Sequence, residues 1–286
     1  MVDQAKLTAL RNKIDAIDNQ LLDLLRARAN VIEEVRGVKG KQAVYIRPGR
    51  EASMLRILVN QPMGHLPAGL VHRLWREMIG AFTLQEGAMK VALPALDGEQ
   101  GFWDLSRDHF GSFTPMQVFP TATASLRAVL NNTVQLAALP FPREGDADVW
   151  WRLLLAEQDT IPNLFYAFPF DGVRGNARKT EHQGVVIGAI PPEATSQDRT
   201  ILVLEWQNIA DKKSADVLCD TLPFVKTAHV FSQAGNDPAC SWPSCSWIEL
   251  DGFVERSNSH LAEWATKHKQ HLLRHKIIGA YPLPIK

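Results

Sequence analysis

The chain has 286 residues, and its 31 lysines and arginines balance its 31 aspartates and glutamates, so the formal net charge is zero. A dedicated nucleic-acid-binding protein normally carries a basic excess, so we expect no nucleic-acid partner. Hydrophobic residues make up 45% of the chain and charged residues 22%, which excludes global disorder and is typical of a folded protein of two or three domains. No run approaches the ~18 consecutive apolar residues of a membrane span, so no membrane partner is expected either.

The cysteines and the first residues of the chain predict a cytoplasmic location. Residues 1–6 carry an acid early and lead directly into a charged amphipathic pattern, unlike a secretory signal peptide. Cys219, Cys240 and Cys245 are too few for a disulfide framework, and the last two are too far apart for a Cys-x-x-Cys motif. We therefore predict ordinary thiols in a reducing compartment and no metal site.

The first ninety residues predict three helices, one of them very long. An apolar repeat with alternating spacings of three and four residues runs over residues 7–38 without an internal proline. A helix of this length is a rod of about 48 Å, which so small a unit cannot cover with its own core. A second copy of the chain is the simplest partner for it. Shorter helices are predicted over residues 48–60 and 70–87, separated by a turn rich in proline and glycine.

Cationic residues stand out against the apolar repeat of the first helix. Arg28 occupies a position that should be apolar, and a buried arginine is costly unless an anion meets it. Lys39 lies 11 residues later and returns to within about 20° of the same helix face. Arg11 points about 100° away from Arg28, so it would serve the pocket of a dimer partner rather than its own. Taken singly, such residues are typical of a solvated surface.

Three more polar residues complete a candidate site. Arg50 and Glu51 stand at the start of the second helix, and Gln85 lies near the end of the third. Four cations, one carboxylate and one amide on so short a helical unit favour a site for a small anionic molecule.

These polar positions and the apolar positions around them resemble the all-helical class of chorismate mutase. The resemblance covers residues 7–88 and is carried by Leu10-Arg11, Ile14-Asp15, Ile17-Asp18, Leu21-Leu22, Leu24-Leu25, Arg28, Val35, Lys39, Arg50-Glu51 and Gln85. It implies an intertwined homodimer that rearranges chorismate to prephenate in phenylalanine and tyrosine biosynthesis, without a cofactor.

The resemblance also implies a role for each polar residue. Arg28 and the Arg11 of a second copy would bind the substrate carboxylates, and Arg50 would lie against the carboxylate end of the site. Lys39 and Gln85 would donate hydrogen bonds to the ether oxygen, where negative charge gathers in the transition state. Glu51 would hold the ring hydroxyl.

Two positions depart from the family pattern. Arg47 stands where some members have aspartate, and Ala81 stands where some have a small hydroxyl residue. These departures favour a first alternative, a non-catalytic aromatic-pathway sensor or assembly protein. A second alternative is an enzyme like the isochorismate–pyruvate lyases, which would keep the helical pocket and remove pyruvate from a related dicarboxylate.

The remaining two hundred residues predict α/β structure. Short apolar runs alternate with amphipathic stretches, which indicates a parallel or mixed sheet. Strands are expected over residues 91–94, 117–119, 135–139, 164–168 and 184–188, and helices over residues 101–111, 122–130 and 146–156. From residue 198 the predicted order changes to strand, helix, two strands, helix and strand, which is the order of a ferredoxin-like domain.

This part resembles the dehydratase and ACT regulatory domains of bifunctional chorismate mutase–prephenate dehydratases. The clearest segments are residues 90–111, 137–155 and the closing Ile278-Gly279-Ala280-Tyr281-Pro282. We therefore expect a helical mutase domain over residues 1–89, a dehydratase-like α/β domain over 90–195 and an ACT-like domain over 196–286.

Dehydratase activity is predicted to be lost. About 100 residues suffice for one of the two lobes between which such a substrate would bind. Phe141-Pro142-Arg143-Glu144 replaces the family's Glu-Asn-Ser segment, and His182-Gln183-Gly184 replaces its Thr-Arg-Phe. Without the threonine hydroxyl no acid is evident for the leaving hydroxyl group. The family's effector-binding turn is also replaced, by Lys213-Ser214-Ala215-Asp216. We expect both modules to serve dimerisation and stability rather than phenylalanine sensing.

Overall fold

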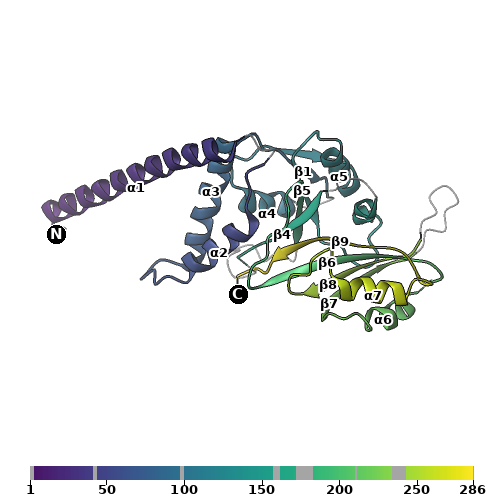
Figure 1. Ribbon diagram of the computed structural model, residues 1–286. Helices are drawn as coiled ribbons and strands as arrows, with labels where there is room; N and C mark the ends of the chain where they lie inside the picture. The colour runs from purple at the N-terminus through teal and green to yellow at the C-terminus, as the bar shows by residue number, and fades with distance from the viewer. Residues whose placement is uncertain are drawn as a thin grey trace.

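The computed structural model describes residues 3–40, 44–96, 100–156, 162–171, 183–209, 211–233 and 243–285. His182 and Cys240, which the sequence analysis singled out, lie outside these ranges. Three helices come first, α1 (Gln4–Lys39), α2 (Pro48–Val59) and α3 (Ala68–Glu86), as the sequence predicted. A mixed sheet with flanking helices follows them (Figure 1).

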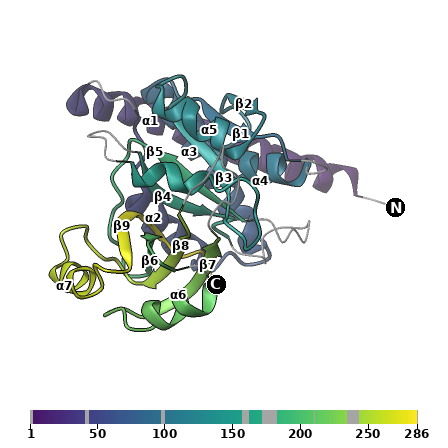
Figure 2. The ribbon, with the colours of Figure 1, turned by 90° about the vertical axis from the view of Figure 1, so that its right-hand side faces the viewer.

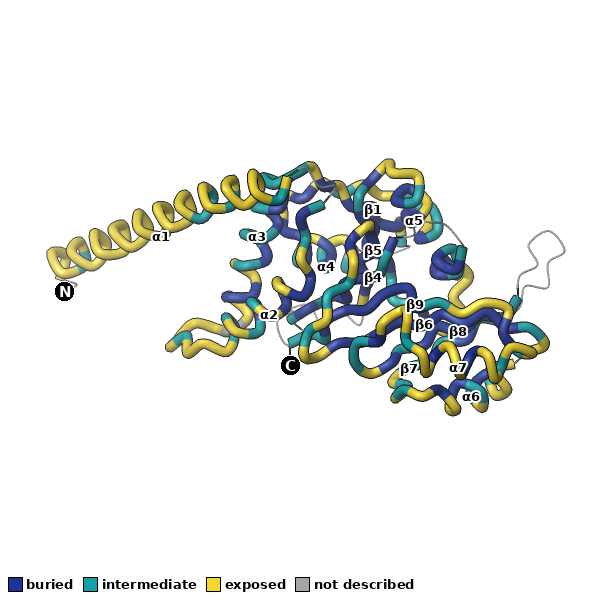
Figure 3. The backbone as a smooth tube through the Cα atoms, viewed as in Figure 1, coloured by how far each residue is buried: buried dark blue, intermediate teal, exposed yellow. Residues whose placement is uncertain are grey.

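The long helix α1 projects from the rest of the molecule as an isolated rod (Figure 1). Asp3 caps it by accepting a hydrogen bond from the Lys6 backbone N–H at 3.0 Å. None of its residues is buried, and its apolar repeat faces solvent over most of its length (Figure 3). The exposed fractions of Ile17 and Leu24, for example, are 54% and 67%. A single copy of the chain therefore leaves the apolar face of α1 uncovered.

Within the described residues, nine strands form one sheet in the order β2-β1-β3-β5-β4-β9-β6-β8-β7. The strands are β1 (Val91–Pro94), β2 (Met116–Phe119), β3 (Leu136–Pro140), β4 (Asn163–Phe168), β5 (Gly184–Gly188), β6 (Asp198–Trp206), β7 (Lys226–Ser232), β8 (Cys245–Asp251) and β9 (Leu272–Pro282). The flanking helices are α4 (Gln100–Phe110), α5 (Ala122–Leu130), α6 (Lys212–Cys219) and α7 (Ser259–Lys267). The pairs β1–β2, β1–β3 and β4–β9 are parallel and the others are antiparallel, so the predicted mixed sheet is confirmed.

The helix expected over residues 146–156 is wrong in extent. The structure has only a 3-10 helix, η1 (Trp150–Leu155). Two acidic residues just before η1 accept hydrogen bonds from backbone N–H groups. Asp146 accepts a hydrogen bond from the Arg143 backbone N–H at 2.7 Å, and Asp148 accepts one from the Thr123 backbone N–H at 2.9 Å. These side chains fix a loop in which a helix was expected.

The two parts predicted as separate α/β and ferredoxin-like domains share this sheet. They join where β4 pairs with β9 at Leu164 and Gly279. A Cβ atom at Gly279 would lie 1.9 Å from the Leu164 carbonyl oxygen, so only glycine lets the strands approach this closely. The strands of the second part lie in the order β9-β6-β8-β7 and are connected as the sequence predicted.

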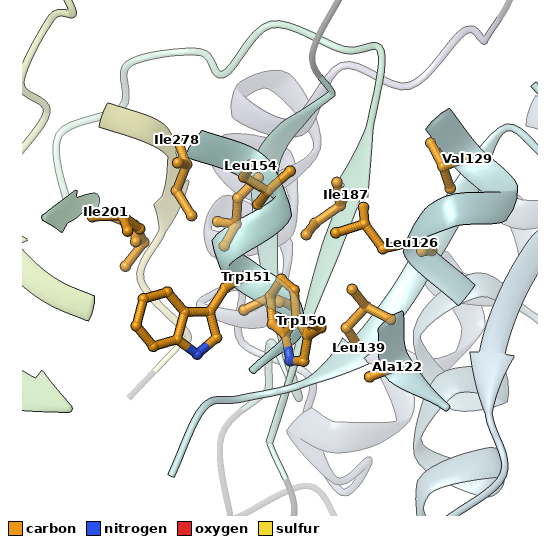
Figure 4. Close-up of a cluster of buried hydrophobic side chains, with 14 of the residues drawn as sticks. Ala122, Leu126, Val129, Leu139, Trp150, Trp151, Leu154, Ile187, Ile201 and Ile278 are labelled. Atoms are coloured by element: carbon orange, nitrogen blue, oxygen red, sulfur yellow. The ribbon is translucent and has the colours of Figure 1, made fainter. Parts of the chain in front are cut away.

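In the described part of the chain, three clusters of buried hydrophobic side chains hold the layers together. The first packs Trp150, Trp151 and Leu154 of η1 against strands from both parts of the sheet, including Ile187 and Ile278 (Figure 4). The second lies between the sheet and the helices α2 and α4. The third lies under α6 and α7, which sit at the opposite end of the molecule from α1 (Figures 1 and 2). Because α2 contributes Ala52 and Leu55 to the second cluster, it is anchored in the sheet's own core.

Candidate active site

Four of the six predicted site residues gather where the end of α1 meets the end of α3 and the start of α2. Lys39 pairs with Glu86, with its Nζ 3.0 Å from the carboxylate Oε1. Gln85 donates a hydrogen bond from Nε2 to the Ala29 carbonyl at 3.1 Å. These two contacts tie the last turn of α3 to α1.

Arg28 is the centre of this cluster. Its guanidinium lies 4.3 Å from the centroid of the Phe82 ring, which is a cation–π contact. Its Nη1 is buried and has no hydrogen-bond partner among the described residues. Burial lowers the pKa of Arg28, the charge of Arg50 lowers it further, and Glu86 opposes both effects. Two arginines with one buried and unpartnered donor make a site that an anion would stabilise.

Arg11 does not join this cluster within its own chain. It is exposed on the projecting part of α1, 17 residues before Arg28, which is roughly 25 Å along the helix at ~1.5 Å per residue. Its prediction as a ligand therefore depends on a second copy of the chain.

Glu51 is held by a different partner, Arg76. Its Oε2 lies 3.1 Å from Nη1 of Arg76, and Nη2 of Arg76 donates to the Tyr166 hydroxyl at 2.8 Å. Burial raises the pKa of Glu51, and Arg76 opposes that rise. This network joins α2, α3 and β4, and Arg76 is only 2% exposed.

The sequence analysis missed Arg76. Two apolar side chains of α3, Leu70 and Leu74, are 37% and 51% exposed. The buried positions include His72 and Arg76, which lie four residues apart on one face. The four-residue spacing of His72 and Arg76 was the available signal. In the sequence, that spacing looks the same as the polar face of a solvent-exposed helix.

A second arrangement of polar residues also escaped the sequence analysis. His229 lies between Asp216 and Ser246, with its Nδ1 2.7 Å from the carboxylate and its Nε2 2.7 Å from the serine Oγ. The order resembles a nucleophile, a base and an orienting acid. Ser246 is completely buried, however, and its Oγ also accepts a hydrogen bond from the Trp206 indole N–H. We therefore interpret the series as structural.

The described residues contain no group of three or more His, Cys, Asp or Glu side chains placed to hold a metal ion. In the same ranges, no helix combines the length and apolar character that crossing a membrane requires.

Comparison with known proteins identifies the helical part. Residues 10–87 match the family described as chorismate mutase type II. The chain carries a chorismate mutase type II domain. The predicted resemblance of the first ninety residues is thereby confirmed.

Relatives of this mutase domain also carry a second activity in their names. A bifunctional chorismate mutase/prephenate dehydratase from Pseudomonas aeruginosa is 36% identical over 156 residues, which cover 52% of this chain and 42% of that protein. Its counterpart from Stutzerimonas stutzeri is 29% identical over 157 residues, with the same coverage. The alignments are longer than the mutase domain, so the similarity continues beyond it. The matched part spans less than half the length of these relatives.

Among solved structures, the prephenate dehydratase from Streptococcus mutans superposes with a TM-score of 0.45 and 12% identity. The superposition covers 69% of this chain and all of that one.

The buried pair of Glu51 and Arg76 yields a stability prediction. Arg76→Met leaves the Glu51 carboxylate without its partner, and breaking a buried pair in this way costs about 3–5 kcal/mol. Arg73→Met is the matched control. Arg73 lies on the same helix as Arg76 and also pairs with an acid, Asp108 of α4, but its side chain is 61% exposed. Its loss should cost less than about 1 kcal/mol. Urea unfolding of both variants measures the difference, and equal losses would contradict the structural role given to Arg76.

Proposed function

We propose that the chain is a chorismate mutase that rearranges chorismate to prephenate. The observation that carries the proposal is the Arg28 guanidinium, whose buried Nη1 has no partner among the described residues although Arg50 adds a second positive charge nearby. A carboxylate of the substrate would satisfy that donor and relieve the repulsion between the two arginines. The mutase domain match covers the same residues.

The proposed reaction depends more on holding the substrate in a reactive conformation than on acid, base or nucleophilic side chains. Chorismate is a flexible dicarboxylate whose enolpyruvyl arm must fold over its ring, and cations that grip both carboxylates remove this entropic barrier. As the C–O bond breaks, negative charge gathers on the ether oxygen. Donors aimed at that oxygen bind the transition state more strongly than the substrate.

We assign Lys39 and Gln85 to the ether oxygen. An ammonium group has three N–H donors and a side-chain amide has two. The contacts with Glu86 and Ala29 use one donor of each residue, so further donors are left for the substrate. For Glu51, Arg76 takes Oε2, so the proposed contact with the ring hydroxyl falls to Oε1.

The proposal includes a homodimer in which α1 crosses a second copy. The support is the uncovered apolar face of α1 and the position of Arg11, which is too far along the rod to reach its own Arg28. In the dimer, Arg11 of the second copy would be the second ligand for the substrate carboxylates. We also propose a cytoplasmic location, supported by a cysteine content too low for a disulfide framework.

We also propose that the α/β part has lost dehydratase activity and that its last part is an ACT-like domain. Phe141 begins the segment that replaces the family's polar motif. Its ring packs edge-on against Trp247 at 5.9 Å and Tyr281 at 6.2 Å between centroids, which supports a structural use of this segment.

Purified protein should consume chorismate and form prephenate, and Lys39→Ala should lower kcat by about 10²–10³-fold because it removes a donor to the ether oxygen. The loss of chorismate absorbance measures the rate, and product analysis separates mutase from lyase chemistry. Lys269→Ala, an exposed lysine of the last module, is the control and should keep the full rate. A near-wild-type rate for Lys39→Ala would refute the assignment.

Ile17→Glu should convert the dimer to a monomer, because it places a charge in the apolar face of α1. Val217→Glu is the matched control, since Val217 is an exposed apolar residue on α6, with 62% of its surface accessible. Analytical ultracentrifugation measures the mass of both variants. A monomeric wild-type protein, or an Ile17→Glu protein that remains dimeric, would argue against this arrangement.

The dehydratase proposal predicts that the wild-type protein forms no phenylpyruvate from added prephenate. The measurement is the absorbance of phenylpyruvate in alkali, corrected for acid-catalysed formation in a sample without protein. Turnover above that background would show that a dehydratase site persists.

A further inference from the structure

The first turn of α2 lacks a cap from its own segment. The N-cap position is Arg47, whose side chain has no acceptor atom and makes no capping hydrogen bond. Pro48 has no backbone N–H, so the open donors of this turn begin at Gly49 and Arg50. A helix end left in this state would fray, and here it carries Arg50 of the proposed site.

Glu193, from the segment between β5 and β6, supplies the missing acceptor. Its Oε2 accepts hydrogen bonds from the backbone N–H of Gly49 at 3.0 Å and of Arg50 at 3.4 Å, and its Oε1 pairs with Nε of Arg47. A carboxylate is favoured at the positive end of a helix. The fit is close, because a Cβ atom on Gly49 would lie 2.8 Å from the Cβ of Glu193.

The same segment holds α2 again two turns later. Arg56 donates from Nη1 to the Thr195 hydroxyl at 3.1 Å, and from Nη2 to the Gln197 carbonyl at 3.1 Å and the Leu283 carbonyl at 2.7 Å. Asp198 fixes Thr195 by accepting from its backbone N–H at 2.7 Å. Two points of attachment, at the cap and at Arg56, prevent α2 from sliding or rotating against the sheet.

We infer that Glu193 is a positioning residue for the mutase site, acting from outside the mutase domain through the first turn of α2. This inference rests on the proposed mutase function. Glu193 accepts a hydrogen bond from the backbone of Arg50, and Arg50 lies near enough to Arg28 for the two charges to repel. The α/β part of the chain thereby helps to fix the position of Arg50 in the proposed site.

The inference separates binding from chemistry. Arg50 meets a carboxylate that is charged in both the substrate and the transition state, so misplacing it weakens both equally. Loss of the cap should therefore raise KM for chorismate about five- to tenfold while kcat changes by less than about threefold. General destabilisation of the fold would instead lower the active fraction of the enzyme and leave KM unchanged.

The test compares Glu193→Ala and the milder Glu193→Gln with Glu144→Ala. Glu144 is a matched control, because it also pairs with a cation, Lys212 of α6, but it has no contact with α2. Hydrogen–deuterium exchange of the segment 44–58, measured by mass spectrometry on the full chain, should be at least about tenfold faster in Glu193→Ala and unchanged in Glu144→Ala. Adding Arg47→Ser to Glu193→Ala supplies a local cap and should restore KM to within about twofold.

Each outcome decides the matter. Unchanged exchange in Glu193→Ala, or faster exchange with an unchanged KM, overturns the inference. If the wild-type protein does not convert chorismate, the proposed function fails. Faster exchange in Glu193→Ala would then show that Glu193 caps α2 without serving a mutase site, which overturns its positioning role as well. A raised KM that Arg47→Ser reverses supports the inference, because only the cap is common to the two changes.

Discussion

A buried guanidinium nitrogen of Arg28, unpartnered within the part of the chain that the structure describes, is the feature on which the proposed site depends. Arg28 lies against Phe82, carries a buried and unpartnered Nη1 in the described structure, and feels the charge of Arg50. A buried donor without a partner is unfavourable, and an anion that accepted its hydrogen bond would offset that cost. The carboxylate of the proposed substrate is such an anion.

Holding Arg50 near Arg28 is therefore a task for the rest of the chain, because like charges repel. The helix that carries Arg50 is fixed by contacts from distant parts of the sequence. Glu193 caps this helix, and the Leu283 carbonyl accepts a hydrogen bond from its Arg56. The Tyr166 hydroxyl accepts one from Arg76, the residue that pairs with Glu51 of the same helix. The family match covers residues 10–87. The contacts that hold the proposed site in place extend beyond those residues, into the sheet.

The sequence predicted most of the elements because their signals are local. The apolar repeat of α1, the proline at the start of α2 and the alternation of strands and helices each depend on neighbouring residues. Arg28 and Lys39 could be grouped for the same reason, since they share a helix face, whereas Gln85 and Arg50 join them through contacts between helices. The capping role of Glu193 could not be predicted, because 144 residues separate it from Gly49 and no local pattern marks an acid that caps a remote helix.

The side of α3 that packs on the rest of the chain carries buried polar residues as well as apolar ones. In an ordinary surface helix, the apolar face is buried and the charged face meets water. Here the sheet side of α3 holds Arg76 and His72, while Leu70 and Leu74 are left exposed. A polar interface of this kind is costly where its groups lack partners. Glu51 and Tyr166 accept hydrogen bonds from the two terminal nitrogens of Arg76, whereas Arg76 Nε and His72 Nε2 are buried without a partner among the described residues. The exposed leucines then join the uncovered face of α1 as apolar surface without a partner in one chain. The helical part therefore divides its apolar residues: Ala52 and Leu55 of α2 pack into the sheet's core, whereas α1 and the exposed leucines of α3 leave apolar surface that the proposed second copy would cover.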